Sequence, residues 1–163
     1  MFTVGLVMSW QPCEEYPRKR VEELFAGRES LTSQEVAALD IPAADRLWVL
    51  LREEIIPAEV LHELACEFAE RALLRERDAG REPDPVYWKA IEAKRTWLRG
   101  EIDDERLKLA RAATWCAPPT AARSAAEASA MAAARAAAWH ATSGAANASE
   151  CEWQLTRVLE VLP

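Results

Sequence analysis

Glycine is scarce in this chain, with five residues in 163, and no glycine-rich loop is present. The motifs G-x-G-x-x-G and G-x-S-x-G and the P-loop are all missing. The chain therefore lacks the common sequence signatures of nucleotide-binding proteins and serine hydrolases. Alanine, glutamate, leucine and arginine dominate instead. These residues favour helices and are poor material for sheets, so the composition argues against an all-β fold.

The chain also lacks features of exported and membrane proteins. No uncharged apolar run reaches the length of a transmembrane helix. The apolar start, residues 1–8, has no basic segment before it, and the first positive side chain is Arg18. The four cysteines, which include no C-x-x-C pair, are typical of reduced thiols: they are Cys13, Cys66, Cys116 and Cys151. We therefore expect a cytoplasmic protein with no membrane partner.

Positive charge is in deficit. The chain has 20 Lys and Arg against 27 Asp and Glu, for a net charge of −7. Residues 110–163 carry four Arg and four Glu, so the whole excess lies in residues 1–109. Direct binding of nucleic acid is disfavoured, because phosphate binding relies on Lys and Arg. The charge favours a protein partner with a basic surface, although a negative surface that only keeps the domain soluble is the alternative.

What the chain does contain is helix material and helix boundaries. Besides 32 alanines it has 46 larger apolar or aromatic residues, enough for one modest core. Pro17, Pro42, Pro57 and Pro85 each stand where a helix can begin. Thr32 with Glu35 forms a predicted capping box, and Ser149 with Glu152 forms a second one.

The sequence therefore predicts an all-α fold, a bundle of seven to eight helices arranged as antiparallel helical hairpins. We expect a single domain over residues 1–163. Within it, residues 1–16 are predicted to be an irregular lead-in. Residues 120–163 are predicted to form Ala-rich C-terminal helices packed on the body, whether within one molecule or across a homodimer.

His62 and Cys66, with Glu63 between them, look like a zinc-binding H-E-x-x-H motif with cysteine as the second ligand. The spacing places both side chains on one helix face, one turn apart. A catalytic zinc site needs a third ligand, and no well-placed candidate is visible. We expect no metal and no cofactor.

Acidic side chains form a stripe on the longest predicted helix, which starts at Pro57. Glu59, Glu63 and Glu67 are four residues apart, and Glu53 and Glu54 precede the helix. We interpret this set as the surface that binds a basic partner: Glu53, Glu54, Glu59, Glu63 and Glu67. Two alternatives remain. The stripe can be an ordinary solvated face, or binding can use the Trp- and Arg-bearing helix over 85–99, with its basic residues Lys89, Lys94 and Arg95.

Several segments together resemble a known family. They are residues 30–42, Asp45–Trp48, Leu64–Arg71, Ala90–Ala93, Trp97–Glu101, Leu109–Ala113, the Ala-Trp run at 132–139, and Glu152–Leu155. This chain resembles the immunity-protein family, small Ala- and Trp-rich helical proteins encoded near bacterial toxin systems and in phages. The resemblance implies a non-enzymatic protein that binds and blocks a toxin, and it brings no catalytic residues. A phage-encoded inhibitor of a host defence nuclease complex, similar to an anti-CRISPR protein, is one alternative. A nucleic-acid accessory protein is another.

Overall fold

The computed structural model describes residues 1–117, 120–129, 131 and 148–162. In these residues the protein has nine α-helices, one short 3₁₀ helix and no strand, so the all-α fold class is confirmed. The one contact of β type in the described part is an isolated bridge between Phe2 and Leu31. The finer arrangement as antiparallel hairpins stays a prediction. None of the helices in the described ranges is both long and apolar enough to cross a membrane.

From α1 to α7 the helices follow each other with short connections. The first part of the chain forms α1 (Val4–Ser9), α2 (Arg18–Phe25), α3 (Ser33–Ala37) and α4 (Ala43–Leu50). The second part forms α5 (Ala58–Asp78), α6 (Pro85–Leu98), α7 (Asp104–Ala113), the 3₁₀ helix η1 (Thr114–Cys116), α8 (Ala121–Ser129) and α10 (Ala148–Val161).

Proline sets four of the helix starts, as the sequence predicts. Pro17, Pro42 and Pro57 are the N-cap residues of α2, α4 and α5. Pro85 is the first residue of α6, behind Asp84, whose side chain accepts a hydrogen bond from the Val86 N–H. Proline suits these positions because its fixed φ matches the helix and its missing N–H would have no partner there.

The capping box predicted at α3 is confirmed. Thr32 Oγ1 accepts a hydrogen bond from the Glu35 N–H at 3.1 Å, and the Glu35 carboxylate accepts one from the Thr32 N–H at 2.7 Å. The Thr32 N–H and hydroxyl both donate to the Glu35 carboxylate, and these two hydrogen bonds hold the pKa of Glu35 below its ordinary value.

Replacing Thr32 with alanine is expected to lower the free energy of unfolding by about 1 kcal/mol, because α3 loses its N-terminal hydrogen-bond acceptor. Thermal unfolding followed by circular dichroism measures the effect. The matched control is Thr156→Ala, since the hydroxyl of this exposed threonine donates to the Glu152 carbonyl within α10 and caps no helix. Equal destabilisation by the two substitutions would contradict the role assigned to the cap.

The expectation of an irregular lead-in over residues 1–16 is wrong for Val4–Ser9, which form α1. The Thr3 side chain caps this helix by accepting from the Leu6 N–H at 3.1 Å. Phe2 is fully buried and exchanges two backbone hydrogen bonds with Leu31. The segment is therefore ordered by long-range contacts of its apolar residues, which local sequence patterns do not reveal.

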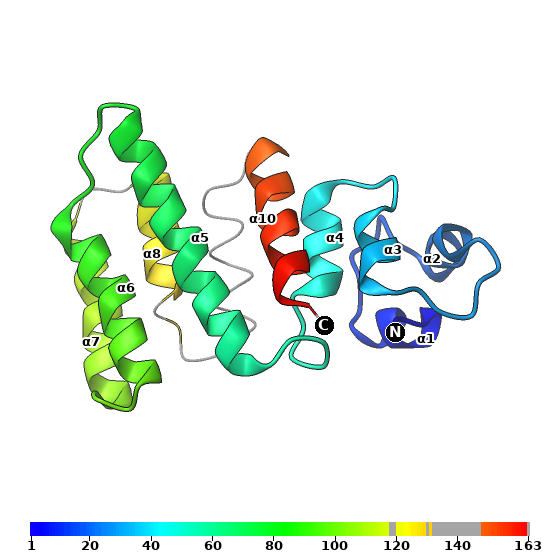
Figure 1. The fold of residues 1–163 in the computed structure, drawn as a ribbon, viewed down its shortest axis with the longest axis horizontal. Coiled ribbons are helices and arrows are strands. Elements are labelled where there is room, and N and C mark those ends of the chain that lie inside the picture. The colour runs from blue at the N-terminus through cyan, green and yellow to red at the C-terminus, as the bar shows by residue number, and fades with distance from the viewer. Residues whose placement is uncertain (118–119, 130, 132–147, 163) are drawn as a thin grey trace.

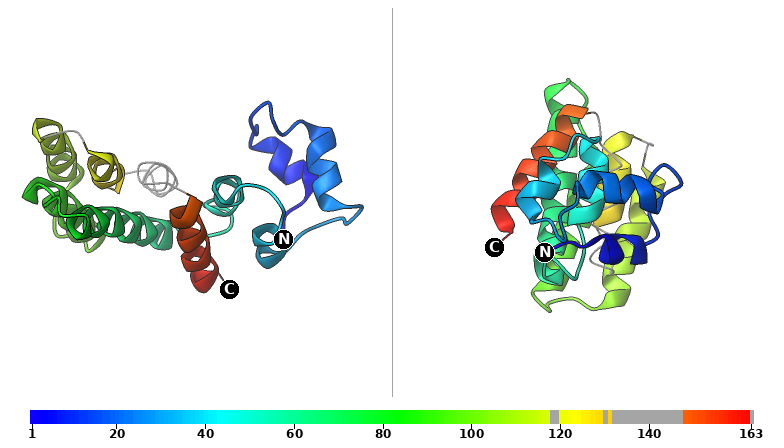
Figure 2. Two further views of the ribbon diagram at one scale, coloured as in Figure 1. Left: turned by 90° about the horizontal axis from the view of Figure 1, so that it is seen from above. Right: turned by 90° about the vertical axis from the view of Figure 1, so that its right-hand side faces the viewer.

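The molecule is elongated, with α1–α3 at one end, α6 and α7 at the other and α4 and α10 in the middle; α5 runs from the α6 and α7 end to this middle (Figures 1 and 2). One face of α5 gives Leu61, Leu64 and Phe68 to the N-terminal core, which we define as the buried cluster shared by α1–α5, the end of α8 and α10. Another face gives Ala69 and Leu73 to the central core, the buried cluster shared by α5, α6 and α8. Burial on both faces explains why α5 is apolar over much of its circumference.

The C-terminal helices pack on this framework. Helix α8 contacts α5 and α6, with Ala125 and Ala126 fully buried, because small side chains allow helices to approach closely. Helix α10 lies against α4 and α5 and contributes Leu155 and Val158 to the N-terminal core. The rest of the Ala-rich segment, residues 132–147, lies outside the described residues.

Candidate binding site

The five predicted acidic residues separate into two groups. Glu53 and Glu54 lie between α4 and α5, and Glu59 is in the first turn of α5; all three are exposed. Glu63 and Glu67, one and two turns further along α5, are half-buried and engaged in ion pairs with neighbouring helices. The stripe is therefore not one continuous solvated face.

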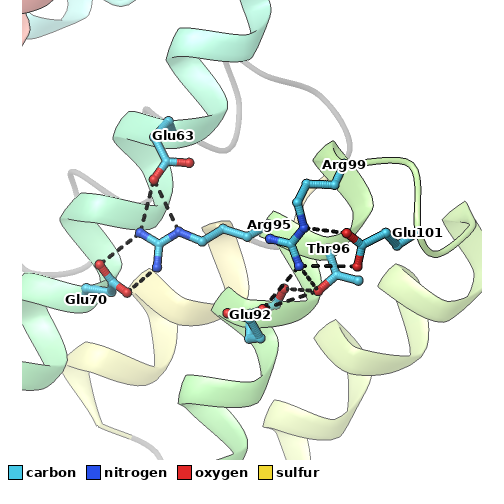
Figure 3. A network of polar contacts seen from close by, with 7 residues as sticks. All are labelled: Glu63, Glu70, Glu92, Arg95, Thr96, Arg99 and Glu101. Carbon is cyan, nitrogen blue, oxygen red and sulfur yellow. Dashed lines mark hydrogen bonds and ion pairs between the residues drawn. The ribbon is translucent and has the colours of Figure 1, made fainter.

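Glu63 belongs to an ion-pair network between α5 and α6. The Arg95 Nη2 of α6 lies 3.1 Å from Glu63 Oε1 and 2.9 Å from Glu70 Oε2, and its Nη1 also contacts Glu70 (Figure 3). The hydrogen bonds to Glu70 raise the pKa of Arg95 further above its ordinary value. A guanidinium held between two carboxylates fixes the distance between the two helices.

Glu67 points to the other side, where it pairs with α10. Arg157 donates from Nε to Glu67 Oε2 at 2.6 Å and from Nη2 to Glu67 Oε1 at 2.8 Å. This bidentate pair is a strong and directional contact. The interpretation of Glu63 and Glu67 as side chains available to a partner needs correction, because α5 is flanked by other helices on both sides. Of the predicted set, Glu53, Glu54 and Glu59 form the exposed acidic margin.

The basic helix predicted as the competing surface is also largely engaged. Lys94 is fully buried; its Nζ donates to the Met131 carbonyl at 2.6 Å and lies 4.0 Å from the Trp97 ring centroid. Arg95 is bound to Glu63 and Glu70, which leaves Lys89 as the exposed cation of the three.

His62 and Cys66 lie beside this buried lysine. The His62 ring packs edge-on against Trp97 with centroids 5.4 Å apart. Burial, and then the charge of Lys94, lower the pKa of His62 to about 4, while burial raises the pKa of the Cys66 thiol to about 12. Burial lowers the pKa of Lys94 to about 8. At neutral pH the imidazole is therefore neutral and the thiol protonated. In the described ranges no three His, Cys, Asp or Glu side chains gather to hold a metal ion.

One feature that the sequence did not reveal is an apolar pocket lined by residues of α1–α4 and their connections, with a volume of about 280 Å³. Phe2, Phe25 and Leu31 are buried in its wall. Leu24 and Val49, which also line it, are half-buried, so the pocket reaches the surface. A concave, mostly apolar pocket of this size is typical of a binding site.

Two polar side chains interrupt this apolar lining. The Tyr16 hydroxyl donates a 2.6 Å hydrogen bond to Asp45 Oδ2. Burial, and then the hydrogen bond to Asp45, raise the pKa of Tyr16 to about 12, so the phenol is neutral at physiological pH. The Arg20 guanidinium lies over the Tyr16 ring, 4.5 Å from its centroid.

Trp10 connects the pocket with the exposed acidic margin. Its ring makes edge-to-face contacts with the pocket residues Phe2 and Trp48, at centroid distances of 6.3 and 6.4 Å. Its Nε1 donates to Glu54 Oε1 at 3.2 Å. Arg52 stacks on both indoles, 4.5 Å from the Trp10 ring and 3.9 Å from the Trp48 ring. The Trp10 ring therefore lies between Glu54 and the pocket residues Phe2 and Trp48, and contacts all three.

Comparison with protein-family models, with curated proteins and with solved structures gives no match. The resemblance to immunity proteins therefore stays a prediction.

Proposed function

We propose that this protein is a non-enzymatic cytoplasmic binding protein that neutralises a protein partner with a basic surface. The partner docks on the apolar pocket of α1–α4, and the exposed acidic margin lies beside the docking site. The observation that carries this proposal is the pocket itself, joined to Glu54 through Trp10. This position replaces the five-residue acidic stripe as the docking surface.

The pocket supplies the affinity. Interfaces between proteins draw most of their binding energy from a few anchor side chains that fill desolvated pockets. Burying one large apolar side chain contributes about 1.5–3 kcal/mol. Side chains such as Phe2 and Leu31 are already held in the wall by their own packing, so little order has to be imposed when an anchor enters.

The acidic margin supplies steering. Carboxylates at Glu54 and Glu59 attract a basic partner and can raise its association rate by about ten- to a thousandfold at low salt. The nucleic-acid alternative loses support, because Lys94 is buried and Arg95 is bound to two carboxylates. A surface that needs those cations to contact phosphates does not have them free.

Filling the pocket is expected to abolish partner binding. Leu24→Trp adds an indole at a lining position, whereas the control Leu74→Trp places the same side chain on α5, outside the pocket. Affinity capture followed by mass spectrometry compares the wild type with both variants. We expect one protein to be retained by the wild type and by Leu74→Trp and reduced at least about tenfold with Leu24→Trp. With that protein purified, addition of the wild type should suppress its activity and Leu24→Trp should not.

Two results would contradict the proposal. Equal retention of every captured protein by Leu24→Trp and Leu74→Trp would exclude the pocket as the docking site. Retention that disappears after nuclease treatment would favour the nucleic-acid accessory role.

Electrostatic steering by the acidic margin is tested separately. Glu59→Arg should slow association with the purified partner at low salt. The control is Glu105→Arg, which changes an exposed residue of α7 and should slow association much less.

A further inference from the structure

Asp45 places a carboxylate in the lining of an otherwise apolar pocket. None of the ion pairs among the described residues includes Asp45, and the Tyr16 hydroxyl is its side-chain hydrogen-bond donor. The neighbouring cation, Arg20, lies over the Tyr16 ring and does not pair with Asp45. Asp45 therefore differs from Glu63, Glu67 and Glu70, which are each bound to an arginine.

An ionised carboxylate has acceptor sites for several donors, and a single neutral phenol fills one of them. Removing such a group from water costs free energy unless a cation or further donors replace the lost hydration. An apolar ligand that enters the pocket displaces water around Asp45. Its binding is then favourable when the ligand itself brings a positive charge to the carboxylate.

Resting on the proposed function, we infer that the pocket recognises an apolar group bearing a cation. In the partner this is an apolar side chain with a lysine or arginine beside it: the apolar side chain fills the cavity and the cation pairs with Asp45. The volume agrees with such an anchor. A cavity of 150 Å³ accommodates benzene, so 280 Å³ has room for about ten non-hydrogen atoms.

Three small probes of similar shape test this chemistry: phenethylamine, 2-phenylethanol and 3-phenylpropanoate. They present the same ring with a positive, neutral or negative end. Titration of the full ¹⁵N-labelled protein, followed by amide chemical shifts, reports both the affinity and the location of binding. We expect saturable shifts in α1–α4, with phenethylamine binding at least about tenfold more tightly than 3-phenylpropanoate.

Substitution of Asp45 identifies the group responsible. Asp45→Asn keeps the shape and removes the charge, so it should bring phenethylamine to the affinity of 2-phenylethanol while leaving the alcohol unchanged. Glu105→Gln removes one carboxylate from the exposed surface of α7 and should preserve the preference for the amine. Leu24→Trp should weaken the binding of all three probes. If Asp45→Asn fails to fold, the order of the three affinities for the wild type still shows whether the pocket prefers a cation.

The outcomes separate this inference from the proposed function. Equal affinity for the three probes would overturn the cation preference, and loss of partner capture by Leu24→Trp would still support docking at the pocket. Amine preference that depends on Asp45, with partner capture unchanged by Leu24→Trp, would support the cation site and overturn the proposed function. Absence of saturable shifts in α1–α4 with every probe would overturn the inference as well.

Discussion

Replacing both Arg71 and Arg75 with alanine is expected to lower the free energy of unfolding by about 3–5 kcal/mol. Both arginines lie on α5 and hold the carboxylate of Glu150 on α10, with Arg71 Nε at 3.0 Å and Arg75 Nη1 at 2.9 Å from Oε2. The Glu150 side chain is 1% exposed. The double variant removes both arginines from this buried carboxylate, and breaking an ion pair in a protein interior by removing one side of it is strongly destabilising.

Urea denaturation followed by circular dichroism measures this loss. The control is Arg77→Ala with Arg81→Ala, which removes the same charge from two exposed positions, one in the last turn of α5 and one in the connection after it. Its expected effect is within about 0.5 kcal/mol of zero. Adding Glu150→Gln to the Arg71 and Arg75 double variant should recover part of the stability, because it removes the buried charge. An equal loss of stability in the Arg71 and Arg75 double variant and in the control variant would show that the pairing of these arginines with Glu150 does not stabilise the protein.

Lowering the pH from 6.5 to 4 is expected to reduce the free energy of unfolding through His62 by about 3 kcal/mol. Burial lowers the pKa of this histidine from 6.5 to about 4 in the folded protein. Between these values the unfolded chain binds a proton and the folded protein does not. The contribution is therefore fully present above pH 6.5 and is lost as the pH falls through 4. Glu59 weakens the shift and Lys94 strengthens it.

Carboxylates titrate in the same range, so the measurement compares two proteins. Urea unfolding of the wild type and of His62→Gln is recorded at several pH values between 4 and 7. We expect the wild type to lose more stability than the variant over this interval, because only the wild type carries the histidine. Parallel pH profiles for the two proteins would refute the assignment to His62.

Local sequence patterns were sufficient to predict the helical class and most helix starts. Pro57 and the Thr32–Glu35 box act on the backbone within a few residues, so their effect does not depend on the rest of the fold. Val4–Ser9 was missed because its order comes from the long-range pairing of Phe2 with Leu31. The spacing of Phe2, Val4 and Val7 was the available signal, and it is too short to distinguish a helix from an irregular segment.

The candidate site was less predictable, because it also depends on contacts between residues that are far apart in the sequence. Helical spacing shows that Glu63 and Glu67 share a face with Glu59, but it does not show which helix covers that face. The arginine that binds Glu67 is 90 positions away in the sequence. Lys94 stands in a run of basic residues and is nevertheless fully buried. The pocket lining is spread over residues 2–49, so no local motif marks it.

A ribosome that has synthesised residues 1–147 has made every helix of the N-terminal core except the last one. Leu155 and Val158 of α10 complete that core, and Glu152 reaches back across 106 positions to Arg46 on α4. Contacts of such large sequence separation form late, because the intervening chain must first be closed into a loop. The first half of the nascent chain therefore keeps apolar surface of α4 and α5 uncovered until α10 has been synthesised and has folded onto it.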